Sequence, residues 1–512
     1  MTPFEYFDTV QRAQEEFDVS RLTLGGVNHW MTVRLLMLGI LSREASKRAV
    51  QTAGVGSHSR MIDNPLGELK SKDTSPTSYS KRVLGESAIL MEPRSIGGSP
   101  AKLVFYELPV DYTQIIDGKA VNRIADGFSE AFGSQVRKVC RFAPDMLNKS
   151  CRVEPSYVFL APQPFVAGVR EREEFSRAVR DFCSYLRSCS SDYALTPTVI
   201  MENVTTVLTQ SAAHEAWIRV LAPELIAFQC FISIEKIGVL IACKRLGIAT
   251  MEVQHGFCDT NSIFNEMPRP QTGVFDIYTD IFWTWGERTA SALKNDSGIA
   301  SHDVRVVAGG DVWGALSAGK AKAARGAFLL SIGSEKYSRR ILVAHQIEAL
   351  VHTKGSNSLV SAVLIDAMRL APHDWLWMVR VHPRSSHLIE PIKKTLNDAG
   401  IVNCEVELTS LATIEVVLEA ADVFLTGFSV SALEANAVGK PVIILDEVGR
   451  RLFGDAMESG SFDFAETAEE ICQLIADSRP PTSDYGYYKR DAEHSRRLLG
   501  ELLNESALAL AV

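Results

Sequence analysis

The segment from Leu225 to Gln254, LIAFQCFISIEKIGVLIACKRLGIATMEVQ, carries the clearest fold signal in the chain. It begins with a short apolar run, Leu225 to Phe231, that is typical of a buried strand. Ser233 to Leu246 is long enough for a helix, and Gly247 suits its C-terminus. Ala249 to Gln254 has the pattern of a second strand. A strand, a helix and a strand joined by short turns predict two parallel strands with a crossover helix.

The same alternation continues on both sides of this segment. Further strands are expected at Lys102 to Leu108, Ser156 to Ala161, Ala327 to Ile332, Trp375 to Val381, Asp422 to Thr426 and Pro441 to Leu445. Helices are expected between them at Val121 to Phe132, Arg170 to Arg187, Ala212 to Leu221, His345 to Ala371, Glu390 to Ala399 and Ser431 to Val438. The pattern predicts an α/β fold in two successive halves, with mostly parallel sheets covered on both faces and a hinge near residues 286–310.

The two ends of the chain differ from this pattern. Residues 1–52 are expected to be helical after a turn at Gly25-Gly26, and 54–100 are rich in Ser, Gly and Pro, as in a long loop or flexible insertion. The tail from Ala468 onward is expected to be helical, with an interruption at Pro480-Pro481.

Composition excludes several classes of protein. The chain has 512 residues, enough for two to four domains, and 53 Lys and Arg against 62 Asp and Glu give a net charge of −9, which argues against a nucleic-acid binder. The nine cysteines are scattered without a CxxC pair, so no zinc site is expected. The N-terminus lacks the pattern of a signal peptide, and no apolar run reaches about 18 residues. We therefore expect a soluble, cytoplasmic protein.

The loops that leave the expected strands are the candidate ligand sites, because open α/β sheets bind ligands beyond the carboxyl ends of their strands. The first such loop is QHGFCD, in which His255 follows a strand and Gly256 permits close backbone approach. His255 and Asp259 are candidate catalytic residues, with Asp259 either orienting the imidazole or serving as the base itself. The alternative is a structural turn histidine bonded to a backbone carbonyl.

The second loop is RVHPR, directly after the strand WLWMV. Strand alternation places Arg380 and His382 on the same side, and Pro383 ends the strand. Two cationic groups at a strand end suit a phosphate, which Arg can bind in a bidentate manner. The alternative is a surface Arg paired with a carboxylate.

The third loop is TGFSVSALE, which leaves its strand through Gly427 and opens a helix with Ser429 and Ser431. Free N–H groups and two hydroxyls at a helix start favour an anion. Glu434 follows Ser431 by three residues, so the alternative is a capping box that only closes the helix end. The loop matches neither GxGxxG nor GxxxxGK[ST], so the usual dinucleotide and P-loop sites are not expected.

Four segments together carry a family resemblance: LGIATMEVQHGF, FWTWGE (Phe282 to Glu287), VRVHP and ADVFLTGFSVSALEANAVGKPVI. They resemble bacterial GT-B glycosyltransferases of capsule, O-antigen, lipopolysaccharide and other surface polysaccharide synthesis, over roughly residues 100–475. The resemblance implies two Rossmann-like domains that face each other across a cleft, with an N-terminal helical extension. The expected parts are 1–100 (helical segment and flexible insertion), 101–300 (acceptor domain), 301–475 (nucleotide-sugar donor domain) and 476–512 (helical tail).

The resemblance also implies roles for the candidate residues. The HP dipeptide is similar to that of CMP-sialic acid, CMP-Kdo and CDP-glycerol transferases, which points to a CMP- or CDP-linked donor. Donor-binding residues would be Arg380, His382, Pro383, Gly427, Ser429 and Ser431 near the phosphates and Glu434 at the ribose. His255 or Asp259 would act across the cleft as acceptor base or leaving-group stabiliser. No acidic base motif like that of the sialyltransferases stands at a matching position.

The partners implied are a nucleotide sugar and an oligosaccharide or lipid-linked glycan acceptor, with no bound cofactor and no metal. A lipid-linked acceptor would bring peripheral contact with the inner face of the cytoplasmic membrane or with an assembly complex. The net negative charge of the chain adds no support for membrane contact. Two alternatives stay open: a sugar-nucleotide epimerase of the same fold, which needs no acceptor, and a non-catalytic scaffold of a polysaccharide assembly complex.

Overall fold

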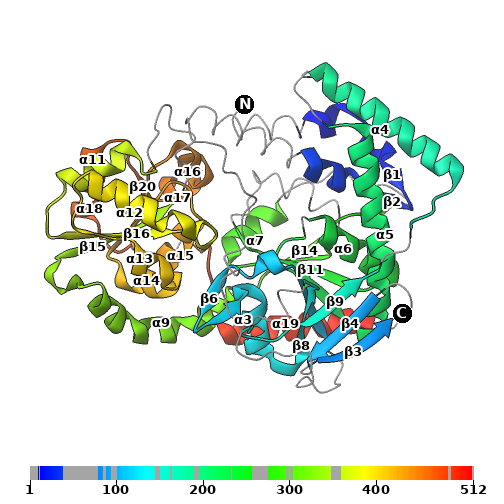
Figure 1. Cartoon of the computed structure of the whole chain (residues 1–512), viewed down its shortest axis with the longest axis horizontal. Helices are drawn as coiled ribbons and strands as arrows, with labels where there is room; N and C mark the ends of the chain where they lie inside the picture. The colour runs from blue at the N-terminus through cyan, green and yellow to red at the C-terminus, as the bar shows by residue number, and fades with distance from the viewer. Residues whose placement is uncertain are drawn as a thin grey trace.

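The computed structural model describes residues 10, 12–37, 79–84, 88–93, 101–143, 150–161, 164–189, 195–231, 233–256, 275–295, 299, 302, 304–346, 359–481 and 486–509. The chain forms two α/β lobes that lie side by side (Figure 1). The first lobe is built on a large sheet and carries the blue to green part of the chain, and the second is yellow to orange. Within the described residues, no helix is long and apolar enough to cross a membrane.

The sheet of the first domain has nine strands among the described residues, in the order β14-β13-β11-β10-β5-β8-β9-β4-β3. In chain order its strands are β3 (Tyr79–Leu84), β4 (Ala88–Pro93), β5 (Leu103–Glu107), β8 (Val136–Arg141), β9 (Ser156–Leu160), β10 (Leu225–Phe228), β11 (Ala249–Val253), β13 (Ile281–Thr284) and β14 (Arg305–Ala308). The strands from β9 to β14 are parallel, and β4 and β3 are added antiparallel. From β5 the chain adds β8 and β9 on one side of the sheet and then returns to place β10 on the other side of β5. The strand order therefore reverses between β5 and β10, although the strands stay parallel.

The sheet of the second domain repeats this topology with six parallel strands in the described part, in the order β17-β16-β15-β18-β19-β20. Its strands are β15 (Arg339–His345), β16 (Trp375–Val381), β17 (Cys404–Glu405), β18 (Val423–Thr426), β19 (Val442–Ile444) and β20 (Phe462–Phe464). The first three strands run outward on one side and the last three on the other, which is the doubly wound order of a Rossmann-like domain. The predicted α/β fold with two Rossmann-like domains is therefore confirmed by the strand orders.

Helices cover both faces of each sheet, as parallel strands require. In and around the first sheet the helices are α3 (Arg123–Phe132), α4 (Val169–Cys189), α5 (Pro197–Leu221), α6 (Ile234–Leu246), α7 (Glu287–Lys294) and α19 (Ala492–Ala509). The second domain carries α9 (Val312–Ser331), α11 (Ala362–Leu370), α12 (Ile389–Asp398), α13 (Glu407–Leu411), α14 (Ile414–Ala420), α15 (Ser431–Ala437), α16 (Glu447–Leu452), α17 (Gly454–Glu458) and α18 (Ala468–Asp477).

Shorter elements complete the description. They are the 3-10 turns η1 (Val19–Arg21), η4 (Pro109–Asp111), η5 (Gly133–Gln135), η7 (Ser334–Lys336) and η8 (Pro383–Leu388), the small sheet of β1 (Thr23–Leu24), β2 (Val27–Asn28) and β12 (Phe275–Asp276), and the hairpin of β6 (Gln114–Ile116) and β7 (Lys119–Val121). The expected turn at Gly25-Gly26 joins β1 to β2 with φ angles of 64° and 72°.

The C-terminal helix returns to the first domain. Leu499 and Leu502 of α19 pack in one core with Phe105 of β5 and Trp283 of β13. Figure 1 shows this helix in red beneath the large sheet. The expected helical tail therefore has two parts: α18 packs on the second sheet through Ile471, and α19 packs on the first.

The central strand–helix–strand prediction is confirmed. The helix α6 begins after Ser233, whose hydroxyl accepts a hydrogen bond from the Lys236 amide at 3.1 Å, and ends at Gly247 with φ 68°. The strands β10 and β11 pair in parallel, with Phe228 opposite Glu252. Trp375 to Val381 is a strand over the predicted residues.

Three local predictions are wrong. Ala327 to Ile332 is not a strand, because its apolar run belongs to the last turns of α9, and short apolar runs do not separate strand from buried helix. The first strand of the second sheet is β15, which includes His345, a residue expected in a helix. The sequence does not indicate the start of β15, because the charged Arg340 stands there in place of an apolar residue. Its guanidinium pairs with Asp422 at 2.8 Å. The expected loop 54–100 contains the strands β3 and β4, and residues 54–78 lie outside the described part.

The approach of Gly309 to Trp283 gives a test of the fold. A Cβ at Gly309 would overlap the Trp283 indole, so Gly309→Ala must displace a ring that is fully buried. We expect a loss of about 1–3 kcal/mol of unfolding free energy, measured by urea denaturation. Gly319→Ala is the matched control, because a Cβ on this exposed face of α9 meets open space and should stabilise the helix by up to about 1 kcal/mol. Equal losses in the two variants would contradict the packing described here.

Candidate functional site

The carboxyl edge of each sheet, where its parallel strands end, holds most of the predicted residues. In the second domain, Arg380 is the next-to-last residue of β16 and its side chain is buried, with 7% of the residue exposed. Its guanidinium donates to the Ala412 carbonyl at 3.1 Å, while Nε has no hydrogen-bond partner within the described part of the chain. Burial lowers the pKa of Arg380 to about 10. A buried guanidinium with a donor left over is suited to an anion from outside the protein.

A cavity of about 220 Å³ lies directly against Arg380. Its wall comes from both domains, because Thr113, Gln114 and Ile115 of the first domain line it together with residues of the second. The residues of the second domain on this wall are Arg380, Val381, Pro383, Ser386, Ile389, Ser410, Leu411, Ala412 and Thr413. The structure thus brings the predicted Arg380 and Pro383 to one pocket between the domains.

His382 lies between these two residues in sequence but is exposed, and it is not among the residues that line this cavity. The turn η8 begins at Pro383, where the backbone leaves the strand. The predicted phosphate contact of His382 stays a prediction.

The loop after β18 is held by a network of short polar contacts. The Gln346 side-chain oxygen accepts from the Phe428 amide at 2.7 Å and from the Thr426 hydroxyl at 3.2 Å. Beyond it, the Ser429 and Ser431 hydroxyls are hydrogen-bonded at 2.7 Å. Both serines are half-buried, and Gly427 precedes them at the end of the strand. This loop lies where the strand order of the second sheet changes direction, between β15 and β18, which is the ligand position of doubly wound sheets.

Glu434 does not form the capping box that its spacing allows, since α15 begins without a side-chain cap. Its carboxylate instead accepts from Arg123 of the first domain at 3.0 Å. The same guanidinium lies 2.7 Å from Glu415, which also accepts from the Trp313 indole at 2.9 Å. Burial opposes ionisation of Glu415, but the charge of Arg123 holds its pKa below the usual range. Arg123 therefore joins the two domains, and the predicted ribose contact of Glu434 stays untested.

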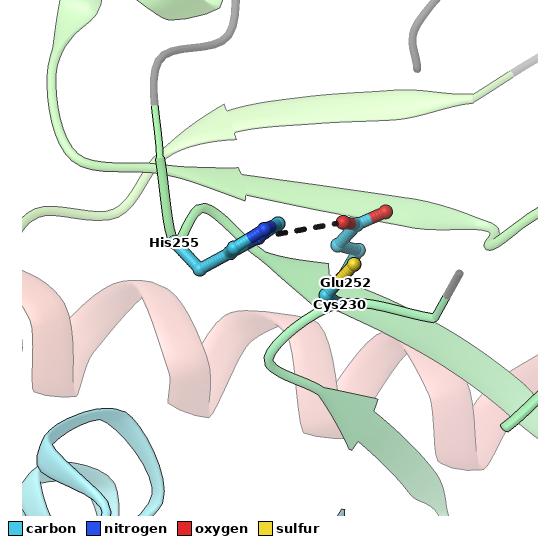
Figure 2. Close-up of side chains that lie close together, drawn as sticks. All are labelled: Cys230, Glu252 and His255. Atoms are coloured by element: carbon cyan, nitrogen blue, oxygen red, sulfur yellow. Dashed lines mark ion pairs between the residues drawn. The ribbon is translucent and has the colours of Figure 1, made fainter. Parts of the chain in front are cut away.

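At the carboxyl edge of the first sheet, His255 follows β11 as predicted. Its Nδ1 lies 3.9 Å from Oε1 of Glu252, a residue of β11 that is 4% exposed. Burial raises the pKa of Glu252 well above its usual range. Figure 2 shows His255, Glu252 and Cys230 with their side chains turned toward one another.

The backbone that carries His255 is fixed by its neighbour Gln254, which is fully buried. The Gln254 side chain donates to the Gly256 carbonyl at 2.9 Å and accepts from the Trp285 amide at 2.8 Å. The imidazole is therefore held at the sheet edge, where it is exposed on one side. The second predicted catalytic residue, Asp259, lies outside the described residues.

Sequence reasoning missed four residues of these two edges: Cys230, Glu252, Arg123 and Glu415. Cys230 follows the apolar run of β10 and Glu252 lies inside β11, and only the register of the two strands brings them together. Arg123 and Glu415 lie on helices of different domains. The one local signal was Asn122, whose side chain caps α3 and so places Arg123 in its first turn.

No family model and no curated protein matches the chain. Among solved structures it is similar to S. aureus MnaA with UDP (11% identity, TM-score 0.46, covering 78% of this chain and 96% of that chain). It is also similar to the UDP-GlcNAc 2-epimerase of Neisseria meningitidis bound to UDP-GlcNAc (12%, 0.44, 78% and 100%) and to Anabaena Alr3699/HepE with UDP and glucose (12%, 0.41, 79% and 100%). Because these TM-scores are below 0.5, the fold is assigned from the two strand orders and not from the similarities.

The arginine between the domains gives a second prediction. Arg123→Met removes the cation that faces two carboxylates, of Glu415 and Glu434, both more than nine-tenths buried. We expect a loss of roughly 3–5 kcal/mol in urea unfolding, the cost of breaking a buried ion pair from one side. The matched control is Arg170→Met, which removes an exposed pair with Glu174 and should leave the unfolding midpoint unchanged. A wild-type midpoint for Arg123→Met would contradict the bridging role.

Proposed function

We propose that this protein is an enzyme that binds a nucleotide sugar between its two domains and transfers the sugar to a hydroxyl of a glycan acceptor. The observation that carries the proposal is the buried Arg380, which lines a cavity formed by both domains and whose Nε has no hydrogen-bond partner among the described residues. A diphosphate suits such a place, because two oxygens of one phosphate can accept the two parallel N–H bonds of a guanidinium.

On this proposal the donor lies along the carboxyl edge of the second sheet. Arg380 binds a phosphate, and the linked hydroxyls of Ser429 and Ser431 offer further donors beside the strand β18. His382 and Pro383 shape the turn after β16, and Gly427 lets the chain leave β18. As the bond to the sugar breaks, negative charge grows on the departing phosphate, and the positive charge of Arg380 stabilises it.

The acceptor then approaches from the first sheet. Glu252 and His255 lie together at its carboxyl edge, and a buried carboxyl beside an exposed imidazole can take a proton from an attacking hydroxyl. The edge also carries Asp111, which pairs with Lys236 at 2.8 Å. Asp111 lies shortly before Thr113, a residue that lines the cavity. The first domain therefore contributes to both the pocket and the edge that receives the acceptor.

Titration of nucleoside diphosphates by calorimetry tests the donor site. Arg380→Lys keeps the charge but loses the fork of donors, and Arg380→Ala loses both. We expect affinity to fall by roughly 10- to 100-fold in the alanine variant, since a hydrogen bond to a charged group contributes about 1.5–3 kcal/mol. Arg369→Ala is the control, because Arg369 is an exposed arginine of α11 that contacts the Ala399 carbonyl and Asp366. Wild-type affinity in Arg380→Ala with a native circular dichroism spectrum would remove Arg380 from the site.

A nucleotide-sugar epimerase is a second candidate, and the close pair of Glu252 and His255 favours it, because epimerisation requires groups that exchange protons at one carbon. UDP-GlcNAc is the first probe, with the products separated by chromatography. A transferase should release UDP only when a glycan acceptor is added, at least about tenfold above the rate without acceptor. An acceptor-independent change in the configuration of the bound sugar would establish the epimerase and reject the transferase.

A further inference from the structure

Cys230, Glu252 and His255 form a compact group at the carboxyl edge of the first sheet. One possible ligand atom from each residue, a sulfur, a carboxylate oxygen and a ring nitrogen, lies within 4.8 Å of the other two. Figure 2 shows the three side chains converging from the ends of two neighbouring strands. Phe228 lies opposite Glu252 in the β10–β11 register, so Cys230 follows just beyond it.

The surroundings leave Glu252 with little positive charge. Its carboxylate is buried, and its one ion-pair contact among the described residues is His255 at 3.9 Å, too long for a hydrogen bond. The nearest ammonium group that acts on it, Lys236, is already paired with Asp111 at 2.8 Å. A carboxylate buried in this way is stable only with a cation or a proton, and the cluster offers room for a cation between three ligand atoms.

The ligand types select the cation. A thiolate, an imidazole and a carboxylate together suit a borderline ion, and Zn²⁺ binds all three in tetrahedral geometry. Bonds of about 2.0–2.3 Å would bring the ligand atoms to roughly 3.3–3.8 Å from one another. The present separations require only a small closure, and the exposed side of His255 allows its ring to move.

We propose that Cys230, Glu252 and His255 bind one Zn²⁺ ion, with the remaining tetrahedral position left for water or a substrate oxygen. Three protein ligands with one open position are the arrangement of a catalytic rather than a structural zinc site. This assignment departs from the expectation of no metal, which rested on the cysteine spacing and on the family resemblance.

The role of the ion follows from its position and rests on the function proposed above. It lies on the edge that receives the acceptor, beside the point between β5 and β10 where the strand order reverses. Zn²⁺ lowers the pKa of an oxygen that it binds, so an acceptor hydroxyl at this site would release its proton to surrounding water more readily, without Glu252 or His255 having to take it. His255 then acts as a ligand, and the metal activates the hydroxyl.

Metal binding by the full-length chain tests the site directly. Protein stripped with a chelator is titrated with Zn²⁺ against a chromophoric competitor, and with Co²⁺ for its sulfur-to-metal charge-transfer absorption. We expect one metal per chain. Cys230→Ser should abolish the charge-transfer band, and Glu252→Gln and His255→Ala should each weaken Zn²⁺ binding by at least about tenfold, the lower range seen even for outer partners of metal ligands.

The control is Cys189→Ser, since Cys189 is an exposed thiol on α4 away from the cluster and its loss should leave affinity and absorption unchanged. The conservative Glu252→Gln keeps the experiment valid where a cysteine variant fails to fold. Absence of stoichiometric binding, or a band that survives Cys230→Ser, would overturn the zinc site. Calorimetry with CMP, CDP, UDP, GDP and dTDP on the stripped protein separates the two proposals. Binding of one of these nucleotides without metal binding rejects only the zinc site, and metal binding without binding of any of the five rejects only the nucleotide-sugar function.

Discussion

One half-buried guanidinium, that of Arg123, sets the relation between the two halves of the molecule. It projects from the first turn of α3 and meets Glu415 at 2.7 Å and Glu434 at 3.0 Å, on two helices of the other domain. Each of these carboxylates would be costly to bury alone, so the contact strongly favours one arrangement of the domains. That arrangement brings the hairpin strand β6 against the end of β16 and so creates the cavity beside Arg380.

The site follows from topology once the domains are placed. Both sheets are doubly wound, and in each the candidate side chains lie at the carboxyl edge, where the strands end in loops. The two edges differ in charge. The second sheet offers Arg380 and two serine hydroxyls, which suit an anion, and the first offers Cys230, Glu252 and His255, which suit a cation or a proton. A reaction between an anionic donor and a hydroxyl acceptor uses both kinds of edge.

Many of the helices and strands can be predicted from the sequence, because their positions depend on local signals such as caps and apolar runs. The unit around α6 is marked by its capping Ser233 and by Gly247, and Trp375 to Val381 is apolar enough to be a buried strand. The position of His255 and Arg380 at strand ends follows from the same signals. The apolar run from Ala327 to Ile332 is short, so neither its length nor the spacing of its apolar residues distinguishes a strand from the end of a longer helix.

The tertiary contacts of the site could not be predicted in this way. Arg123 and Glu434 are 311 positions apart, and nothing near either residue indicates the other. Cys230 reaches Glu252 only through the register of two strands, and a register is decided by the packing of the whole sheet. Glu434 illustrates the difference: its spacing from Ser431 fits a capping box, but the stronger charge of Arg123 determines where its carboxylate lies.

The central claim is that the cavity between the domains binds the nucleotide part of a sugar donor. A thermal-unfolding screen of the purified chain with CMP, CDP, UDP, GDP and dTDP tests it most directly. The account predicts that one of the five raises the stability of the folded state, by about 2.7 kcal/mol at a hundredfold excess over its dissociation constant. No shift with any of the five at millimolar concentration would contradict the account and favour a non-catalytic scaffold.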